Sequence, residues 1–113
     1  MKWLLALSIA GMAVAPARAQ SFASNIGQGN GLLRACEDEG GYAGGLCLGF
    51  ILGSVQGRAG ILSGKTCPSE QVTNGQMIDV VVAYLKAHPK TRDLNSDLLI
   101  GAAFIDAWPC PKE

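Results

Sequence analysis

The sequence predicts an all-α protein, a small four-helix up-down bundle stapled by two disulfides. Three observations lead to this fold. Apolar residues recur with helical spacing, glycines and prolines punctuate the chain at intervals of about one helix, and four cysteines occur within only 113 residues. A domain of this size buries only part of its surface, so we expect covalent cross-links to contribute much of its stability.

The N-terminal segment has the organisation of a secretory signal peptide. Lys2 precedes an apolar run over residues 3–15, and an Ala-Arg-Ala triplet follows at residues 17–19. The run is shorter than the ~20 apolar residues that span a bilayer, which favours cleavage after residue 19 over a membrane anchor. We therefore expect residues 1–19 to be removed and residues 20–113 to form one periplasmic domain that does not insert into the membrane.

Charge and composition exclude several classes of function. Loss of Lys2 and Arg18 with the leader leaves seven basic against nine acidic residues, a formal charge of −2. A slightly acidic domain of this kind is not expected to bind nucleic acid or anionic lipid. No Cys-x-x-Cys occurs and the single His88 is far along the chain from every cysteine, so we expect neither a metal site nor a cofactor.

The sequence shows no arrangement of residues that would support catalysis. The glycines of residues 27–31 form a lone Gly-x-Gly run with no strand before it, which is not a phosphate loop. No nucleophile has a base at a recognisable spacing, because the cysteines are expected to be oxidised and His88 precedes a proline. We therefore expect a protein that is not an enzyme.

The first two helices are predicted before Ser63. One helix is best supported over residues 32–36, and paired glycines after it end it. The second covers residues 42–60, where Gly45, Gly49, Gly53 and Gly57 recur every four residues among apolar side chains. Residues four apart lie on one helix face, so these glycines predict a face that allows close helix packing, either inside the domain, which we favour, or at a homodimer seam.

The last two helices have clearer boundaries. The third runs over residues 73–87, with a capping box at its start and an apolar stripe at positions 77, 80, 81, 84 and 85. His88 is interpreted as a helix-end cation and Pro89 as the stop. The fourth covers residues 95–107, with Leu98, Leu99, Ala102, Ala103, Phe104 and Ile105 expected to be buried.

Up-down order predicts how the four cysteines pair. Cys36 and Cys47 fall at one end of such a bundle, and Cys67 and Cys110 fall at the other. Of the three pairings open to four cysteines, only Cys36–Cys47 with Cys67–Cys110 brings the partners within disulfide reach. A crossover connection between helices would change this result.

Three segments stand out in order along the chain: Cys47-Leu48-Gly49-Phe50-Ile51-Leu52-Gly53, the stretch from Cys67-Pro68 through Gln76 to Pro89, and the ending from Ala103 to Trp108-Pro109-Cys110. Together they resemble the Rap/Tai family, the resistance-associated and amidase immunity proteins of type VI secretion. The resemblance implies a small helical periplasmic protein, often dimeric, whose protein partner is a peptidoglycan amidase toxin. It also implies partner contacts between the last two helices, which here means Tyr84, His88, Lys90, Arg92 and Asp93.

Two classes of function therefore follow from the sequence. The first is a periplasmic immunity protein that inhibits a type VI amidase effector by occluding its active site. The alternative is a small disulfide-bonded periplasmic chaperone or envelope-assembly factor that has no toxin partner. The exposed, charged connection over residues 88–93 suits recognition in either case.

Overall fold

The computed structural model describes residue 11, residues 25–38 and residues 41–112. The predicted signal peptide and its cleavage site therefore lie outside the described residues, apart from Gly11. No helix within the described ranges is long and apolar enough to cross a membrane.

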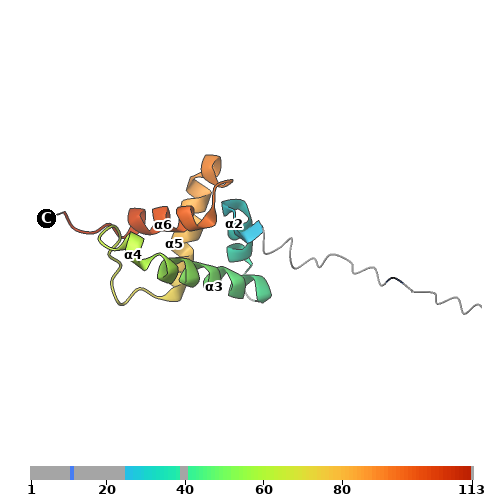
Figure 1. Cartoon of the computed structure of the whole chain (residues 1–113), viewed down its shortest axis with the longest axis horizontal. Helices are drawn as coiled ribbons and strands as arrows, with labels where there is room; N and C mark the ends of the chain where they lie inside the picture. The colour runs from blue at the N-terminus through green and yellow to red at the C-terminus, as the bar shows by residue number, and fades with distance from the viewer. Residues whose placement is uncertain (1–10, 12–24, 39–40, 113) are drawn as a thin grey trace, which may run out of the picture.

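The described chain is helical, which confirms the predicted all-α fold (Figure 1). Within the described residues there is no strand, and the only β-type contacts are two isolated bridges. The elements are α2 (Gly29–Glu37), α3 (Tyr42–Gly57), α4 (Ala59–Leu62), α5 (Asn74–Ala87), the 3-10 turn η1 (Pro89–Thr91) and α6 (Ser96–Ala107). The three long helices α3, α5 and α6 match their predicted positions closely.

The predicted helix over residues 42–60 is interrupted at Arg58. Here the backbone has φ −111° and ψ 13°, and α4 continues in a new direction. At this break the Arg58 side chain reaches α6, where its Nη1 donates a hydrogen bond to the backbone carbonyl of Asp97. The break between α3 and α4 therefore coincides with a contact across 39 residues.

The start of α5 confirms the predicted capping box. The Thr73 hydroxyl accepts from the Gln76 backbone N–H at 3.1 Å, and the Gln76 side chain accepts from the Thr73 N–H at 2.8 Å. These bonds satisfy donors that the first turn of a helix leaves unpaired. The stripe is confirmed as well, since Val81 and Leu85 are buried and the other three members pack against the core.

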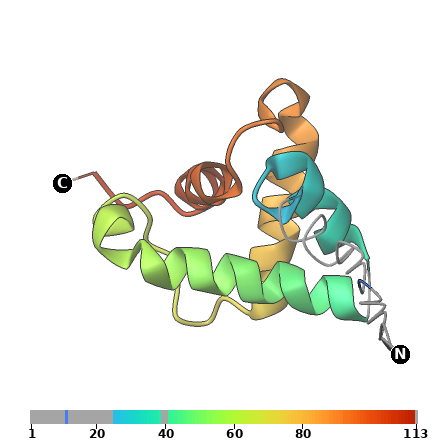
Figure 2. The same cartoon turned by 45° about the vertical axis from the view of Figure 1, so that its right-hand side comes forward.

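The helices cross one another at large angles around a single core. Figure 2 shows α3 running across α5, with α6 seen nearly end-on beside them. The largest fully buried apolar side chains come from all four main helices: Leu32, Ile51, Val81, Leu85, Ile100 and Phe104.

Two residues that were expected to be buried in α6 are exposed. Leu98 retains 56% and Ile105 37% of its accessible surface, whereas Phe104 is 1% exposed. The buried face is instead formed by Ser96, Leu99, Ile100, Ala103 and Phe104, which have the spacing of one helix face. Because α6 is apolar all round, its sequence does not indicate which face meets the other helices.

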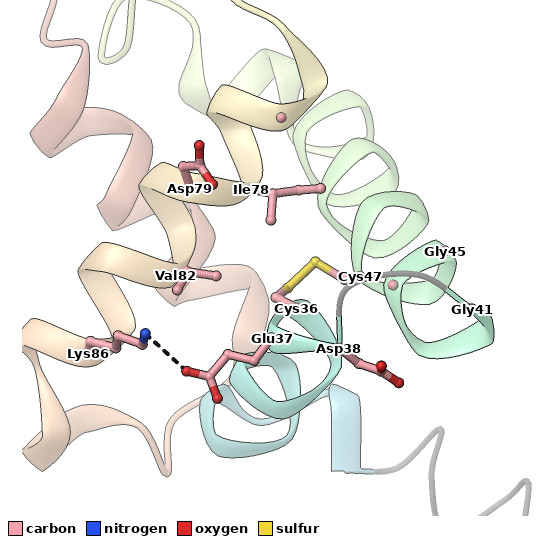
Figure 3. A pocket seen from close by; sticks show the side chains of 12 residues that line it. Cys36, Glu37, Asp38, Gly41, Gly45, Cys47, Ile78, Asp79, Val82 and Lys86 are labelled. Carbon is pink, nitrogen blue, oxygen red and sulfur yellow. Dashed lines mark ion pairs between the residues drawn. A yellow bond between two sulfur atoms is a disulfide. The ribbon is translucent and has the colours of Figure 1, made fainter.

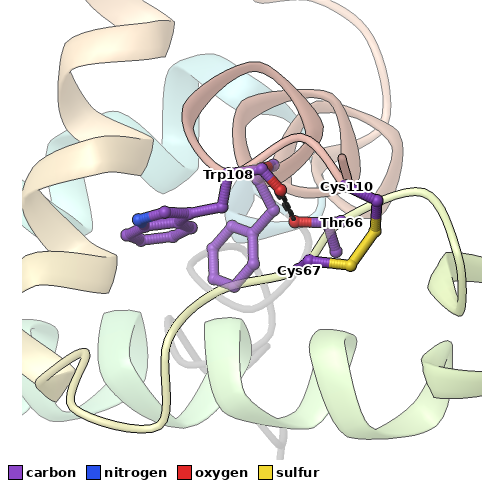
Figure 4. The surroundings of a disulfide bond; sticks show 5 residues. Thr66, Cys67, Trp108 and Cys110 are labelled. Atoms are coloured by element: carbon purple, nitrogen blue, oxygen red, sulfur yellow. Dashed lines mark hydrogen bonds between the residues drawn. A yellow bond between two sulfur atoms is a disulfide. The ribbon is translucent and has the colours of Figure 1, made fainter. Parts of the chain in front are cut away.

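Both disulfides form as predicted. Cys36 and Cys47 join α2 to α3 with a Cα–Cα distance of 5.0 Å (Figure 3). Cys67 and Cys110 join the loop after α4 to the C-terminal segment at 4.8 Å (Figure 4). The second bridge is supported by hydrogen bonds, because the Cys67 N–H donates to the Trp108 carbonyl at 2.8 Å and the Thr66 hydroxyl donates to the same oxygen at 3.0 Å.

Candidate functional site

The end of α5 holds two rings in a fixed arrangement. The Tyr84 and His88 rings stack with centroids 4.0 Å apart and planes inclined by 23°. His88 Nδ1 lies 2.7 Å from the Tyr84 carbonyl oxygen. A carbonyl only accepts, so Nδ1 carries the hydrogen in this contact. The His88 ring therefore donates to a carbonyl in the last turn of α5 and stacks on the Tyr84 ring; the cationic role expected from the sequence stays a prediction.

The chain then turns sharply through η1, where Pro89 fixes the first dihedral. Lys90 and Asp93 are exposed, and both belong to the residues that were predicted to bind a partner. Arg92 is only partly exposed, and its Nε is buried without a hydrogen-bond partner. We call residues 84–93 the α5–α6 corner; it contains all five residues that were predicted to contact a partner, and their role stays a prediction.

The connection from this corner into α6 is held by the N-terminal part of α2. The Asn30 N–H donates to the Arg92 carbonyl at 2.8 Å, and the Gly29 N–H donates to the Leu94 carbonyl at 3.0 Å. Ser96 donates two further hydrogen bonds in the opposite direction. Its N–H donates to the Gly27 carbonyl at 2.8 Å, and its buried hydroxyl donates to the Ile26 carbonyl at 2.6 Å. One of these four hydrogen bonds therefore holds the corner itself, at Arg92, and the other three hold Leu94 and Ser96 directly after it.

Two glycines make this attachment possible. A Cβ on Gly29 would meet Leu99 Cδ1 at 2.4 Å and the Arg92 carbonyl oxygen at 2.7 Å, and one on Gly31 would meet the Asn25 carbonyl oxygen at 1.8 Å. From the sequence, this run appeared only as a weak Gly-x-Gly. Gly29 lets α2 approach the corner closely, and Gly31 lets it approach the turn that precedes α2. The requirement at Gly29 comes from Leu99 and Arg92, which are distant in sequence.

The glycine face of α3 does not pack inside the domain. Gly45, Gly49, Gly53 and Gly57 are exposed, and a Cβ at any of them would find nothing within 4 Å. The favoured expectation of an internal helix contact is therefore wrong for the described residues. The buried side of α3 lies opposite and contains Cys47, Ile51 and Ser54. A homodimer seam on the glycine face stays a prediction.

A cavity of about 600 Å³ lies among α2, α3 and α5, beside the Cys36–Cys47 bridge. Its lining includes Glu37, Asp79 and Lys86, and Figure 3 shows the Lys86 ammonium directed at Glu37, 3.2 Å away. Both partners are about half exposed, so this pair contributes little to stability. In the described ranges, no three His, Cys, Asp or Glu side chains come together as metal ligands would.

Comparison with known proteins identifies the family. A family model described as Rap1a immunity proteins matches residues 28–110. No curated protein and no solved structure gives a significant match. The matched region spans every element from α2 to α6, both disulfides and the α5–α6 corner. On this evidence the chain belongs to the Rap1a immunity protein family.

Proposed function

We propose that this protein is a periplasmic immunity protein that binds a type VI peptidoglycan amidase effector and blocks it by covering the active site. Membership of an immunity-protein family implies a toxin effector as the partner, and such families are generally non-enzymatic. The amidase target, the periplasmic location and the occlusion of the cleft are our proposal. The resemblance of the chain's motifs to amidase immunity proteins supports them.

The observation that carries the proposal is the α5–α6 corner. The turn projects beyond the neighbouring helices in Figure 2 and presents the exposed side chains of Lys90 and Asp93. Its backbone is held by hydrogen bonds to α2 and by the ring stack at the end of α5. Contacts of this kind reduce the conformational entropy that a projecting segment loses on entering a cleft, which favours tight binding.

The test is a charge reversal at the corner with a matched control elsewhere. Lys90→Glu and Lys65→Glu make the same charge change at exposed positions, but Lys65 lies in the turn after α4, away from the corner. We expect Lys90→Glu to weaken binding of an amidase from the same gene neighbourhood by about five- to tenfold in calorimetric titration. Lys65→Glu should bind like the unmodified protein.

Two results would contradict the proposal. One is an unmodified protein that neither binds the amidase nor protects cells that produce it in the periplasm. The other is an equal effect of Lys90→Glu and Lys65→Glu on affinity, which would remove the corner from the interface. A chaperone or assembly factor would give the first of these results. Circular dichroism of both variants checks that the fold is retained.

A further inference from the structure

A second hollow adjoins the α5–α6 corner. It has a volume of about 310 Å³ and lies between α5 and α6. Two alanine pairs line it, Ala83 and Ala87 on α5 and Ala103 and Ala107 on α6, each pair one helical turn apart. We call it the alanine groove. The short side chains leave the space open, and its volume is at the lower limit for ligand sites, which suits a single long side chain.

The charge of the alanine groove is not compensated. Asp106 belongs to its lining and is exposed, and its carboxylate has no ion-pair partner among the residues that the structure describes. Asp106 also lies in the last turn of α6, which contains no basic residue. A helix C-terminus carries partial negative charge, so an acid here works against helix stability. The position of Asp106 is therefore not explained by the needs of the helix.

These features are complementary to one kind of side chain. Alanine walls suit an aliphatic stem, while a carboxylate beside a helix C-terminus suits a cationic head group. Tyr84 and His88 line the groove and also form the base of the α5–α6 corner, so the two surfaces are continuous. A partner that binds the corner can reach the groove with one side chain.

We propose that the alanine groove accepts an arginine or lysine side chain of the protein partner, with its charge paired to Asp106. The proposal extends the proposed function, because the same partner would contact the corner. It assigns Asp106 and the four alanines to the interface, which the family motifs do not indicate.

The groove can be tested without the toxin. In NMR titrations with N-acetyl-arginine amide and N-acetyl-lysine amide, we expect saturable shifts of the amide signals of Ala83, Ala87 and Ala107. N-acetyl-glutamate amide should give none. Asp106→Asn should weaken binding about three- to fivefold. Ala83→Leu should abolish it by filling the groove, and the exposed helical position tolerates leucine.

A matched control is Asp79→Asn, which neutralises an exposed acid on α5 that lines the other cavity. It should leave the titration unchanged. Shifts that do not saturate, equal binding of the glutamate derivative, or an Asp106→Asn variant that binds like the unmodified protein would each overturn the proposal.

The amidase titration separates the two proposals. If the unmodified protein does not bind the amidase, the proposed function fails while the fragment titrations still decide the chemistry of the groove. If the amidase binds and Lys90→Glu weakens it, but Asp106→Asn and Ala83→Leu do not, the corner is in the interface and the groove proposal is wrong. Weakening by all three variants supports both.

Discussion

Glycine-to-alanine substitutions should have opposite effects on the two sides of this molecule. Gly49 lies in the middle of α3, and a Cβ built there has no neighbour within 4 Å. Alanine is favoured over glycine inside a helix by ~0.8–1 kcal/mol. With no steric cost, Gly49→Ala should raise the free energy of unfolding by about this amount, which is roughly 4–8 °C in melting temperature for a domain of this size.

Gly29→Ala is the matched control, because the chemical change is identical. Here the added methyl would lie 2.7 Å from the Arg92 carbonyl oxygen, which is backbone and cannot rotate away. Overpacking of this kind costs ~1–3 kcal/mol, which exceeds the stabilisation expected from the higher helix propensity of alanine. We expect Gly29→Ala to lower the free energy of unfolding by about 1–2 kcal/mol.

Urea denaturation of the oxidised variants, followed by circular dichroism, measures both effects. The reasoning fails if Gly49→Ala is destabilising, since that result requires atoms close to the glycine face. Repeating the measurement over a range of protein concentrations identifies their source. A destabilisation that shrinks on dilution would show that a second copy covers α3, because dilution removes the dimer's contribution to stability.

Three other substitutions test the contacts that define the fold. Replacing Cys67 and Cys110 together by serine should cost ~4 kcal/mol in the chain-entropy model, because their bridge spans 43 residues; a change in melting temperature below ~2 °C would be incompatible with a structural role. Thr73→Ala should lose ~1 kcal/mol by thermal denaturation while Thr73→Ser retains the cap. Ser96→Ala should lose ~1–3 kcal/mol, because it leaves the buried Ile26 carbonyl without the hydroxyl donor, and hydrogen exchange should show faster opening at the start of α6.

Local chemistry made most of the helices predictable. The Thr73 capping box, the apolar stripe of α5 and the proline after His88 are each determined within a few residues, and the structure confirms all of them. The disulfide pairing was also predictable, because the expected up-down order places Cys36 near Cys47 and Cys67 near Cys110. Apart from the second bridge, which spans 43 residues, these features do not depend on distant neighbours.

Features set by distant contacts were missed. The contact that Arg58 makes at the break is with a carbonyl 39 residues away, and the exposure of Leu98 depends on which side of α6 meets the other helices. The close approach at Gly29 likewise needs Leu99 and Arg92 in place. The candidate corner was found as a segment, but its rigidity and the adjoining groove follow only from the packing of α2 and α6 against it.

The order of the disulfides along the chain has a consequence for how the protein is made. The bridges join the cysteines pairwise in their order along the sequence, Cys36 to Cys47 and then Cys67 to Cys110. An oxidant that couples thiols as they emerge, N-terminal end first, therefore produces the native pairing directly. In the periplasmic location that we propose, maturation should require a thiol oxidase but no reshuffling enzyme.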